Sequence, residues 1–175
     1  MCKRTLSIGG AVCLLILSLV ACGGSGTSSA HRAATQRQAD LYAIDQIEKT
    51  WHRATSTQNV ELMMSLWAPN ATFTVGPGQT LVGKKQIRRF WTGAPVFQPK
   101  NHWVSDTPAY KIRITVNGDR GTLYFECHYV DPNTRRLVAV TGADQQVARI
   151  GGRWLITNNV GGTPTLAAPP RARKH

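Results

Sequence analysis

The sequence NHWVSDTPAYKIRITVNGDRGTLYFECHYVDPNTRRLVAVTGADQQVARIGGRWLITNN, residues 101–159, decides how this chain folds. Apolar and polar residues alternate along much of it, which is the pattern of strands with one buried face. Asn117-Gly118, Asp131-Pro132-Asn133 and Gly151-Gly152 are typical turn sequences and divide the stretch. It therefore predicts four strands in a row, entered through the short segment 102–106, with Gly142 as the candidate for a bulge.

Three helices are expected on the N-terminal side of this sheet, with a strand at residues 71–75 between the second and the third. Residues 40–54 have apolar side chains at three- and four-residue steps, which predicts an amphipathic helix with one buried face. Asn59 can cap a second, short helix, and residues 84–91 form the third, with four basic residues outward. Helices followed by a meander predict an α+β domain, in which a curved antiparallel sheet packs against three N-terminal helices.

The two ends of the chain differ from this central domain, which is expected over residues 39–161. Residues 1–21 contain Lys3 and Arg4, an apolar run and then small residues, which is typical of an export signal. Residues 22–38 are rich in glycine, serine, threonine and alanine, and predict a flexible tether. Residues 162–175 contain three prolines and three basic residues before the final histidine, and predict a disordered basic tail.

The sequence Leu19-Val20-Ala21-Cys22 resembles the lipobox of bacterial lipoproteins. In that family the cysteine is acylated and becomes the new N-terminus. The resemblance implies a protein held by a lipid on Cys22 at the extracytoplasmic face of a bacterial cell membrane. The alternative is an ordinary signal peptide followed by an incidental cysteine. Loss of the signal would leave Cys127 as the only other cysteine, so no internal disulfide is expected.

The chain is strongly basic, with 21 lysines and arginines against 9 aspartates and glutamates and a formal net charge of +12. It shows neither a nucleic-acid-binding motif nor basic residues interleaved with exposed aromatics, so no nucleic-acid partner is expected. Basic residues favour contact with anionic lipid head groups or cell-wall polymers. A solvated surface without a dedicated partner is the alternative.

Four short motifs occur in a familiar order: SLWAPNATF at residues 65–73, Gly83 followed by Ile87 and Trp91, NGDRGT at 117–122, and RIGGRW at 149–154. With them, the region from about residue 40 to 160 resembles the nuclear transport factor 2-like superfamily, and within it the SnoaL-like branch. The resemblance implies a cone-shaped fold with a pocket between sheet and helices, often in homodimers. Because the fold hosts isomerases, dehydratases, cyclases and non-catalytic binding modules, it does not by itself give the function.

His102 is the first candidate for catalysis. Several SnoaL-like proteins open a strand with R-H-x-x-x-N, in which the histidine points into the pocket and in some enzymes is the general base. Residues 101–106 read NHWVSD, so the histidine is present and its flanking residues differ. An imidazole exchanges a proton near neutral pH, which suits that role. In one branch of the family a carboxylate orients this histidine, but the matching residues 55–57 contain no carboxylate. The alternative is a histidine in the pocket wall that is hydrogen-bonded to backbone.

The resemblance also suggests further site residues. Asp144 aligns with a protonated aspartic acid that serves ketosteroid isomerases as an oxyanion donor, but the other two parts of that site fall on Trp51 and Val75. A surface carboxylate is the alternative for Asp144. Arg149 matches an arginine that some members use to hold an anionic group, or else it lies outside the pocket. The expected ligand-binding residues are Trp51, Trp103, Tyr42, Tyr124 and Arg149.

Other chemistry is not indicated. No group of histidines, cysteines or carboxylates has metal-ligand spacing, no phosphate-binding loop is present, and no cofactor is expected. His52 and His128 are interpreted as surface or sheet-face residues.

Three functions follow, in order of preference. The first is a lipid-anchored envelope protein that binds a small apolar or amphipathic ligand in the cone pocket. The second is a cofactor-independent isomerase, dehydratase or cyclase with His102 as base and Asp144 or Arg149 stabilising negative charge. The third is a structural envelope domain that acts through its sheet face.

Overall fold

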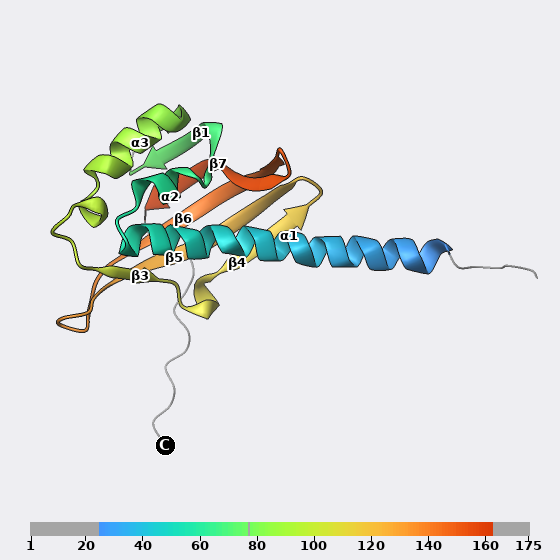
Figure 1. The fold of residues 1–175 in the computed structure, drawn as a ribbon, viewed down its shortest axis with the longest axis horizontal. Helices are drawn as coiled ribbons and strands as arrows, with labels where there is room; N and C mark the ends of the chain where they lie inside the picture. Colours follow the sequence, from blue (N-terminus) through green and yellow to red (C-terminus); the bar gives the residue numbers. More distant parts are fainter. Residues whose placement is uncertain (1–24, 77, 163–175) are drawn as a thin grey trace, which may run out of the picture.

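The structure, a computed structural model, describes residues 25–76 and 78–162 (Figure 1). The expected signal peptide, Cys22 and the tail beyond residue 162 lie outside the described residues. Within them, helices lie against one face of a curved seven-stranded sheet. The predicted α+β class is therefore confirmed.

The helices are α1 (Ser25–Ser56), α2 (Val60–Met64) and α3 (Gly83–Gly93), with short 3-10 turns η1 (Pro95–Phe97) and η2 (Ala109–Lys111). The strands are β1 (Trp67–Val75), β2 (Gln79–Val82), β3 (Val104–Asp106), β4 (Arg113–Asn117), β5 (Arg120–Asp131), β6 (Arg136–Ile150) and β7 (Arg153–Gly162). They are ordered β2-β1-β7-β6-β5-β3, and β4 also pairs with β5. All pairs are antiparallel except β1 with β7, which is parallel and departs from the expected antiparallel sheet.

Helix α1 is longer than the sequence predicts. It was expected to begin near Asp40, after a flexible tether, but it is helical from Ser25. Alanine, glutamine and arginine between residues 30 and 38 are good helix formers, which accounts for the extension. Residues 28–39 are exposed, and this part of α1 projects beyond the sheet in Figure 1. Buried contacts begin at Asp40. On the predicted apolar face, Leu41 is half-buried, and the buried members are Ile44, Ile47, Trp51 and Ala54.

The hairpins follow the turn sequences closely. Asn117 pairs with Arg120 and Ile150 with Arg153, so both loops contain two residues. Gly151 and Gly152 both have positive φ, 56° and 77°, as a type I′ hairpin loop requires. The expected bulge at Gly142 is wrong. The β5–β6 register shifts between Tyr129 and Val130 instead, and the β6–β7 register between Gln146 and Val147.

One predicted strand begins later than expected. The alternation of Tyr110, Ile112, Ile114 and Val116 predicts a strand from residue 110. Instead, residues 109–111 form the turn η2 and the strand starts at Arg113. In this turn Lys111 is buried and donates a hydrogen bond from Nζ to Glu126 Oε1 at 2.7 Å.

Aromatic side chains dominate the core between helices and sheet. Trp51 on α1 lies with its ring centroid 5.6 Å from Phe125 on β5, 6.0 Å from Trp67 and 5.0 Å from Trp91 on α3. These edge-on and tilted contacts are the arrangements that aromatic pairs prefer. The rings hold α1, α3 and the sheet together, and they set the walls of the space beside them.

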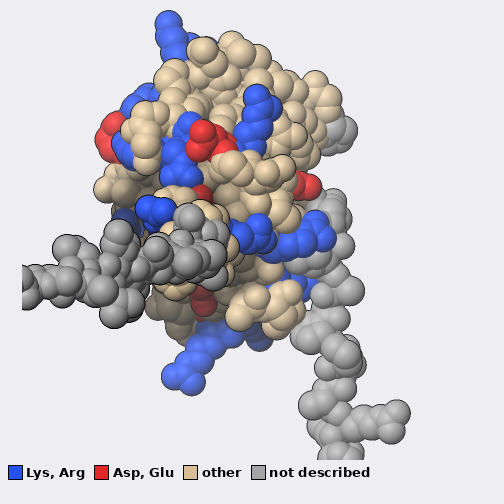
Figure 2. Space-filling view, turned by 90° about the vertical axis from the view of Figure 1, so that its right-hand side faces the viewer, with Lys and Arg blue, Asp and Glu red and all other residues tan. Residues whose placement is uncertain are grey.

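Basic residues are distributed over the face of the molecule that Figure 2 shows. Figure 2 views the side toward which α1 projects, and lysine and arginine side chains are spread over it with carboxylates among them. Some are paired, as Arg88 is with Glu61 and Arg149 with Asp40 and Asp119. This face resembles a solvated basic surface more than one concentrated patch.

Candidate functional site

A cavity of about 360 Å³ lies on the inner face of the sheet, where α1, α3 and η1 meet β5, β6 and β7. Its walls are mostly apolar and aromatic, and they include Trp51, Phe73, Phe90, Trp91 and Trp103. Two larger hollows, of about 520 and 720 Å³, lie at the β4–β5 hairpin and between α1 and β4. Both are lined largely by exposed or half-exposed side chains, so the inner cavity is the better site for a small molecule.

The aromatic walls hold each other in place. Phe73 stacks on Trp91, with centroids 5.5 Å apart and an interplanar angle of 14°. Trp91 meets Trp51 edge-on at 88°, and Trp103 tilts against Tyr129 at a centroid distance of 6.5 Å. Rings packed in this way lose little further freedom when a ligand enters, which favours a preformed apolar site.

Apart from the tryptophan indoles, few polar side chains line the cavity: Cys127, Tyr129, Thr141 and Asn159. Burial raises the pKa of the Cys127 thiol to about 12, and burial also raises the pKa of the Tyr129 hydroxyl well above its usual value. Both groups therefore stay neutral near pH 7. A buried thiol of this kind is a poor nucleophile because the thiolate is the reactive form.

His102 does not line this cavity. Its side chain is 51% exposed, and its Nε2 lies 3.3 Å from Asp131 Oδ1 at the far end of β5. The next residue, Trp103, takes the place at the cavity wall. The expectation that His102 points into the pocket is therefore not met: in the irregular segment before β3 the tryptophan is the inward residue.

Asp144 and Arg149 lie away from the cavity as well. Asp144 is exposed and alternates with the inward Ala143 and Gln145, so it is on the other face of the sheet. Arg149 lies at the β6–β7 hairpin, where Nη2 is 2.6 Å from Asp40 Oδ1 and Nε is 2.8 Å from Asp119 Oδ1. The three candidates His102, Asp144 and Arg149 do not converge on one site.

Arg149 has a structural role instead. Burial alone would raise the pKa of Asp40, but hydrogen bonds from Arg149, Gln36 and Trp154 outweigh burial and lower it. The guanidinium also lies over the Trp154 ring, 4.9 Å from its centroid. Arg149 thus links the first buried turn of α1 to the β4–β5 and β6–β7 hairpins.

The predicted ligand-binding aromatics divide into two groups. Trp51 and Trp103 line the cavity. Tyr42 does not, because it is 67% exposed on the outer side of α1. Tyr124 is buried, but its strand neighbours Leu123 and Phe125 point into the core, so it lies on the opposite face of the sheet.

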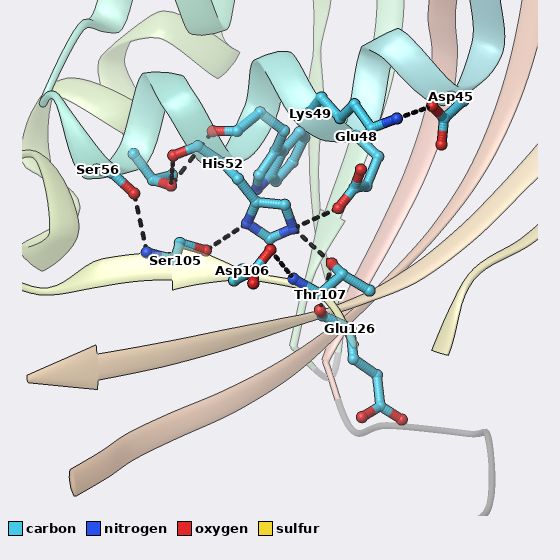
Figure 3. A network of polar contacts seen from close by, with 11 residues as sticks. Asp45, Glu48, Lys49, His52, Ser56, Ser105, Asp106, Thr107 and Glu126 are labelled. Carbon is cyan, nitrogen blue, oxygen red and sulfur yellow. Dashed lines mark hydrogen bonds and ion pairs between the residues drawn. The ribbon is translucent and has the colours of Figure 1, made fainter. Parts of the chain in front are cut away.

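His52 forms a buried network that the sequence did not suggest (Figure 3). Its Nδ1 lies 2.5 Å from Ser105 Oγ, and its Nε2 lies 2.5 Å from Thr107 Oγ1 and 3.1 Å from Glu48 Oε1. Two features of the sequence could have indicated this network. Glu48 and His52 have the i,i+4 spacing of neighbours on a helix, and the hydroxyl residues Ser105 and Thr107 alternate as on one face of a strand. None of these residues lines the inner cavity, so the network serves to join α1 to β3.

A second buried network lies on the opposite face of the sheet. Glu126 accepts a hydrogen bond from Lys111 and lies 2.9 Å from His128 Nε2. Burial alone would raise the pKa of Glu126, but its hydrogen bonds with Lys111 and His128 outweigh burial and lower it. The prediction that His128 lies on a sheet face agrees with this position.

Within the described residues, no three histidines, cysteines or carboxylates are placed to hold a metal ion. The helices of that same part of the chain include none with the length and apolar character needed to cross a bilayer.

Comparison with known proteins adds a family and a fold. A family model described as a SnoaL-like domain matches residues 49–155. No curated protein matches the chain significantly. An NTF2-like protein with a cystatin-like fold from Novosphingobium aromaticivorans is 15% identical, with a TM-score of 0.63, covering 79% of this chain and 90% of that one.

Two further solved structures are similar in fold. A protein of unknown function with a cystatin-like fold from Nostoc punctiforme is 17% identical, with a TM-score of 0.62 and coverage of 73% and 94% of the two chains. A provisionally assigned dehydratase of the NTF2-like family from Streptomyces avermitilis is 15% identical, with a TM-score of 0.59 and coverage of 74% and 99%. At these identities the likeness shows a common fold.

Proposed function

The chain belongs to the SnoaL-like domain family, and on this premise we propose that it binds a small, uncharged and largely apolar molecule in the inner cavity without converting it chemically. The observation that carries the proposal is the composition of the cavity wall. The described lining residues include three tryptophans and two phenylalanines, and no carboxylate, imidazole, ammonium or guanidinium group.

The same composition argues against catalysis by general acid or base. Such a catalyst needs a group whose pKa lies near the working pH and that reaches the substrate. Cys127 and Tyr129 titrate far above neutral pH, and His102 is outside the cavity. The isomerase or dehydratase alternative would need a base that the described lining lacks, so binding is preferred.

Binding can be tested with N-phenyl-1-naphthylamine, an uncharged apolar probe that fluoresces more strongly in apolar surroundings. We expect saturable binding with one site per chain. Ala139 lies on the cavity wall, so Ala139→Trp should fill the space and weaken binding by about tenfold or more. Ala109→Trp, at an exposed position outside the cavity, is the matched control and should bind like the unaltered protein. Probe binding that ignores Ala139→Trp would contradict the proposal.

We further propose that Cys22 carries a lipid and holds the protein at the extracytoplasmic face of a bacterial membrane. The support is the Leu19-Val20-Ala21-Cys22 motif directly after an apolar run. Expression in a bacterial host with an alkyne-tagged fatty acid should label the unaltered protein, and Cys22→Ser should abolish the label. Equal labelling of both would contradict lipid attachment at Cys22. The homodimer implied by the family resemblance stays a prediction.

A further inference from the structure

Asn159 carries the most unusual polar group in the cavity. Its side chain lines the cavity wall and is 1% exposed. Neither its Nδ2 nor its Oδ1 has a hydrogen-bond partner among the described residues. A buried polar group without a partner is destabilising and calls for a physical explanation, such as a bound molecule.

The space beside this amide is part of the cavity. Gly161, two residues further along β7, points to the same side of the strand and also lines the cavity. A Cβ atom at residue 161 would lie 3.2 Å from Phe73 Cε2, closer than ordinary contact, and 3.7 Å from Asn159 Nδ2. Because Gly161 has no side chain, β7 adds no side-chain atom beside the amide at this position, where the Phe73 ring is the nearest neighbour.

Two more donors line the same walls without a hydrogen-bond partner among the described residues. They are the indole N–H groups of Trp51 and Trp91. The Trp51 N–H lies near Tyr129 and Cys127 but is not hydrogen-bonded to either. The cavity therefore offers more free donors than free acceptors, and a carbonyl oxygen is the ligand atom that donors of this kind hold best.

We propose that Asn159 is the polar recognition group of the cavity and pairs with an amide-like edge of the ligand, one carbonyl oxygen beside one N–H or O–H. Primary carboxamides, lactams and neutral carboxylic acids have such an edge. The reason is that a carboxamide presents a donor and an acceptor side by side, and only a ligand with both satisfies both. A carboxylate anion is disfavoured because no cationic side chain is among the described lining residues. The inference rests on the proposed function and specifies its ligand.

Gln145 supplies a matched control. It lies directly opposite Asn159 across the β6–β7 pair, is fully buried, and its Nε2 and Oε1 also lack partners among the described residues. Gln145 is, however, not among the residues that line the cavity. Its removal changes the same kind of buried amide without changing the group that a ligand meets.

The experiment compares three flat ligands of the same skeleton by isothermal titration calorimetry. In 2-naphthamide the side group has an acceptor and a donor, in 2-acetylnaphthalene only an acceptor, and in 2-isopropenylnaphthalene neither. For each variant we take the ratio of the Kd of 2-isopropenylnaphthalene to the Kd of 2-naphthamide. Comparing this ratio between variants removes the cost of desolvating the free ligands, because that cost is the same for every variant. Asn159→Leu keeps the branching of the side chain, and we expect it to lower this ratio by about tenfold or more.

In the unaltered protein, the Kd of 2-acetylnaphthalene should lie between those of the other two ligands. Gln145→Met should leave the Kd ratio within about twofold of its value in the unaltered protein. Circular dichroism checks that each variant is folded, and Asn159→Ala replaces Asn159→Leu if the latter is not. An unchanged ratio in a folded Asn159 variant, or an equal loss in Gln145→Met, would overturn the assignment to Asn159 while leaving the cavity as a binding site. Failure of all three ligands to bind the unaltered protein would instead overturn the proposed function and the inference with it.

Discussion

Glu126 shows how a single buried carboxylate joins side chains from two elements, η2 and β5. It is 2% exposed and is bonded to Lys111 from η2 and to His128 from its own strand. The ammonium of Lys111 is itself buried, so Glu126 neutralises a charge that would otherwise be costly in that place.

Glu126 also gives the fold a dependence on acid pH. Because its pKa is lowered in the folded state, it contributes stability that is fully present above the unfolded value of about 4.3. This stability is lost as the pH falls through the folded value. We predict that Glu126→Gln lowers the free energy of unfolding at pH 7 by about 1–3 kcal/mol.

The same substitution should flatten the loss of stability below about pH 4.3, since one carboxylate fewer must be protonated there. Urea unfolding at several pH values measures both effects. If the variant is as stable as the unaltered protein at pH 7 and loses stability in acid to the same extent, the Glu126 network contributes nothing to the stability of the fold.

At the scale of elements, the β6–β7 hairpin depends on two glycines with positive φ. We predict that Gly152→Ala, at φ 77°, lowers the free energy of unfolding by about 1 kcal/mol or more, because alanine is strained in that conformation. Gly93→Ala at the end of α3 is the control. Its φ is not in the left-handed region and a Cβ there meets no atom within 4 Å. Chemical denaturation measures the free energy of unfolding of both variants, and we expect the larger loss in Gly152→Ala. Similar losses in the two variants would contradict the role of the turn.

Elements with a clear period were predictable from the sequence, and so were the loops between them. The three- and four-residue steps of α1 identified its buried face, and the turn sequences fixed the hairpins at residues 117–120 and 150–153. The segment 101–112 has no such period. Its shape depends on contacts with distant residues, such as Lys111 with Glu126 and Ser105 with His52. His102 was expected inside the cavity from the family resemblance, and His52 at the surface or on a sheet face, whereas His52 is buried and His102 half exposed.

The cavity could be predicted only in part. Trp51 and Trp103 were expected at its wall and are found there. Asn159 was missed because an asparagine near the end of a strand usually indicates a turn. Its inner position depends on the register of β7, which places Asn159 opposite Phe73 of β1 and Gln145 of β6.

At the scale of the whole molecule, the first part of α1 is separable from the folded body. Residues 28–35 are exposed and precede Asp40, the first buried residue of α1. We predict that a chain starting at residue 36, which keeps the hydrogen bonds of Gln36 to Asp40 and Arg37 to the Val116 carbonyl, melts within about 3 °C of the full chain.

A chain starting at residue 48 provides the comparison. It lacks Ile44 and Ile47, which are buried in the core, and should not fold cooperatively. Thermal unfolding followed by circular dichroism distinguishes the two truncations. A large loss of stability in the longer one would show that the exposed turns of α1 contribute to the fold.

The parallel pair of β1 with β7 determines when the sheet can form during synthesis. In the sheet, β7 stands between β1 and β6, so without it the β2–β1 hairpin and the β6–β5–β3 group are two unconnected pieces. Thr72 pairs with Asn158, and contacts so far apart in the chain carry a high contact order and form slowly. A nascent chain that has not yet emerged as far as residue 162 can make hairpins and helices but cannot close its sheet. Folding of this domain is therefore expected to follow translation of its last strand.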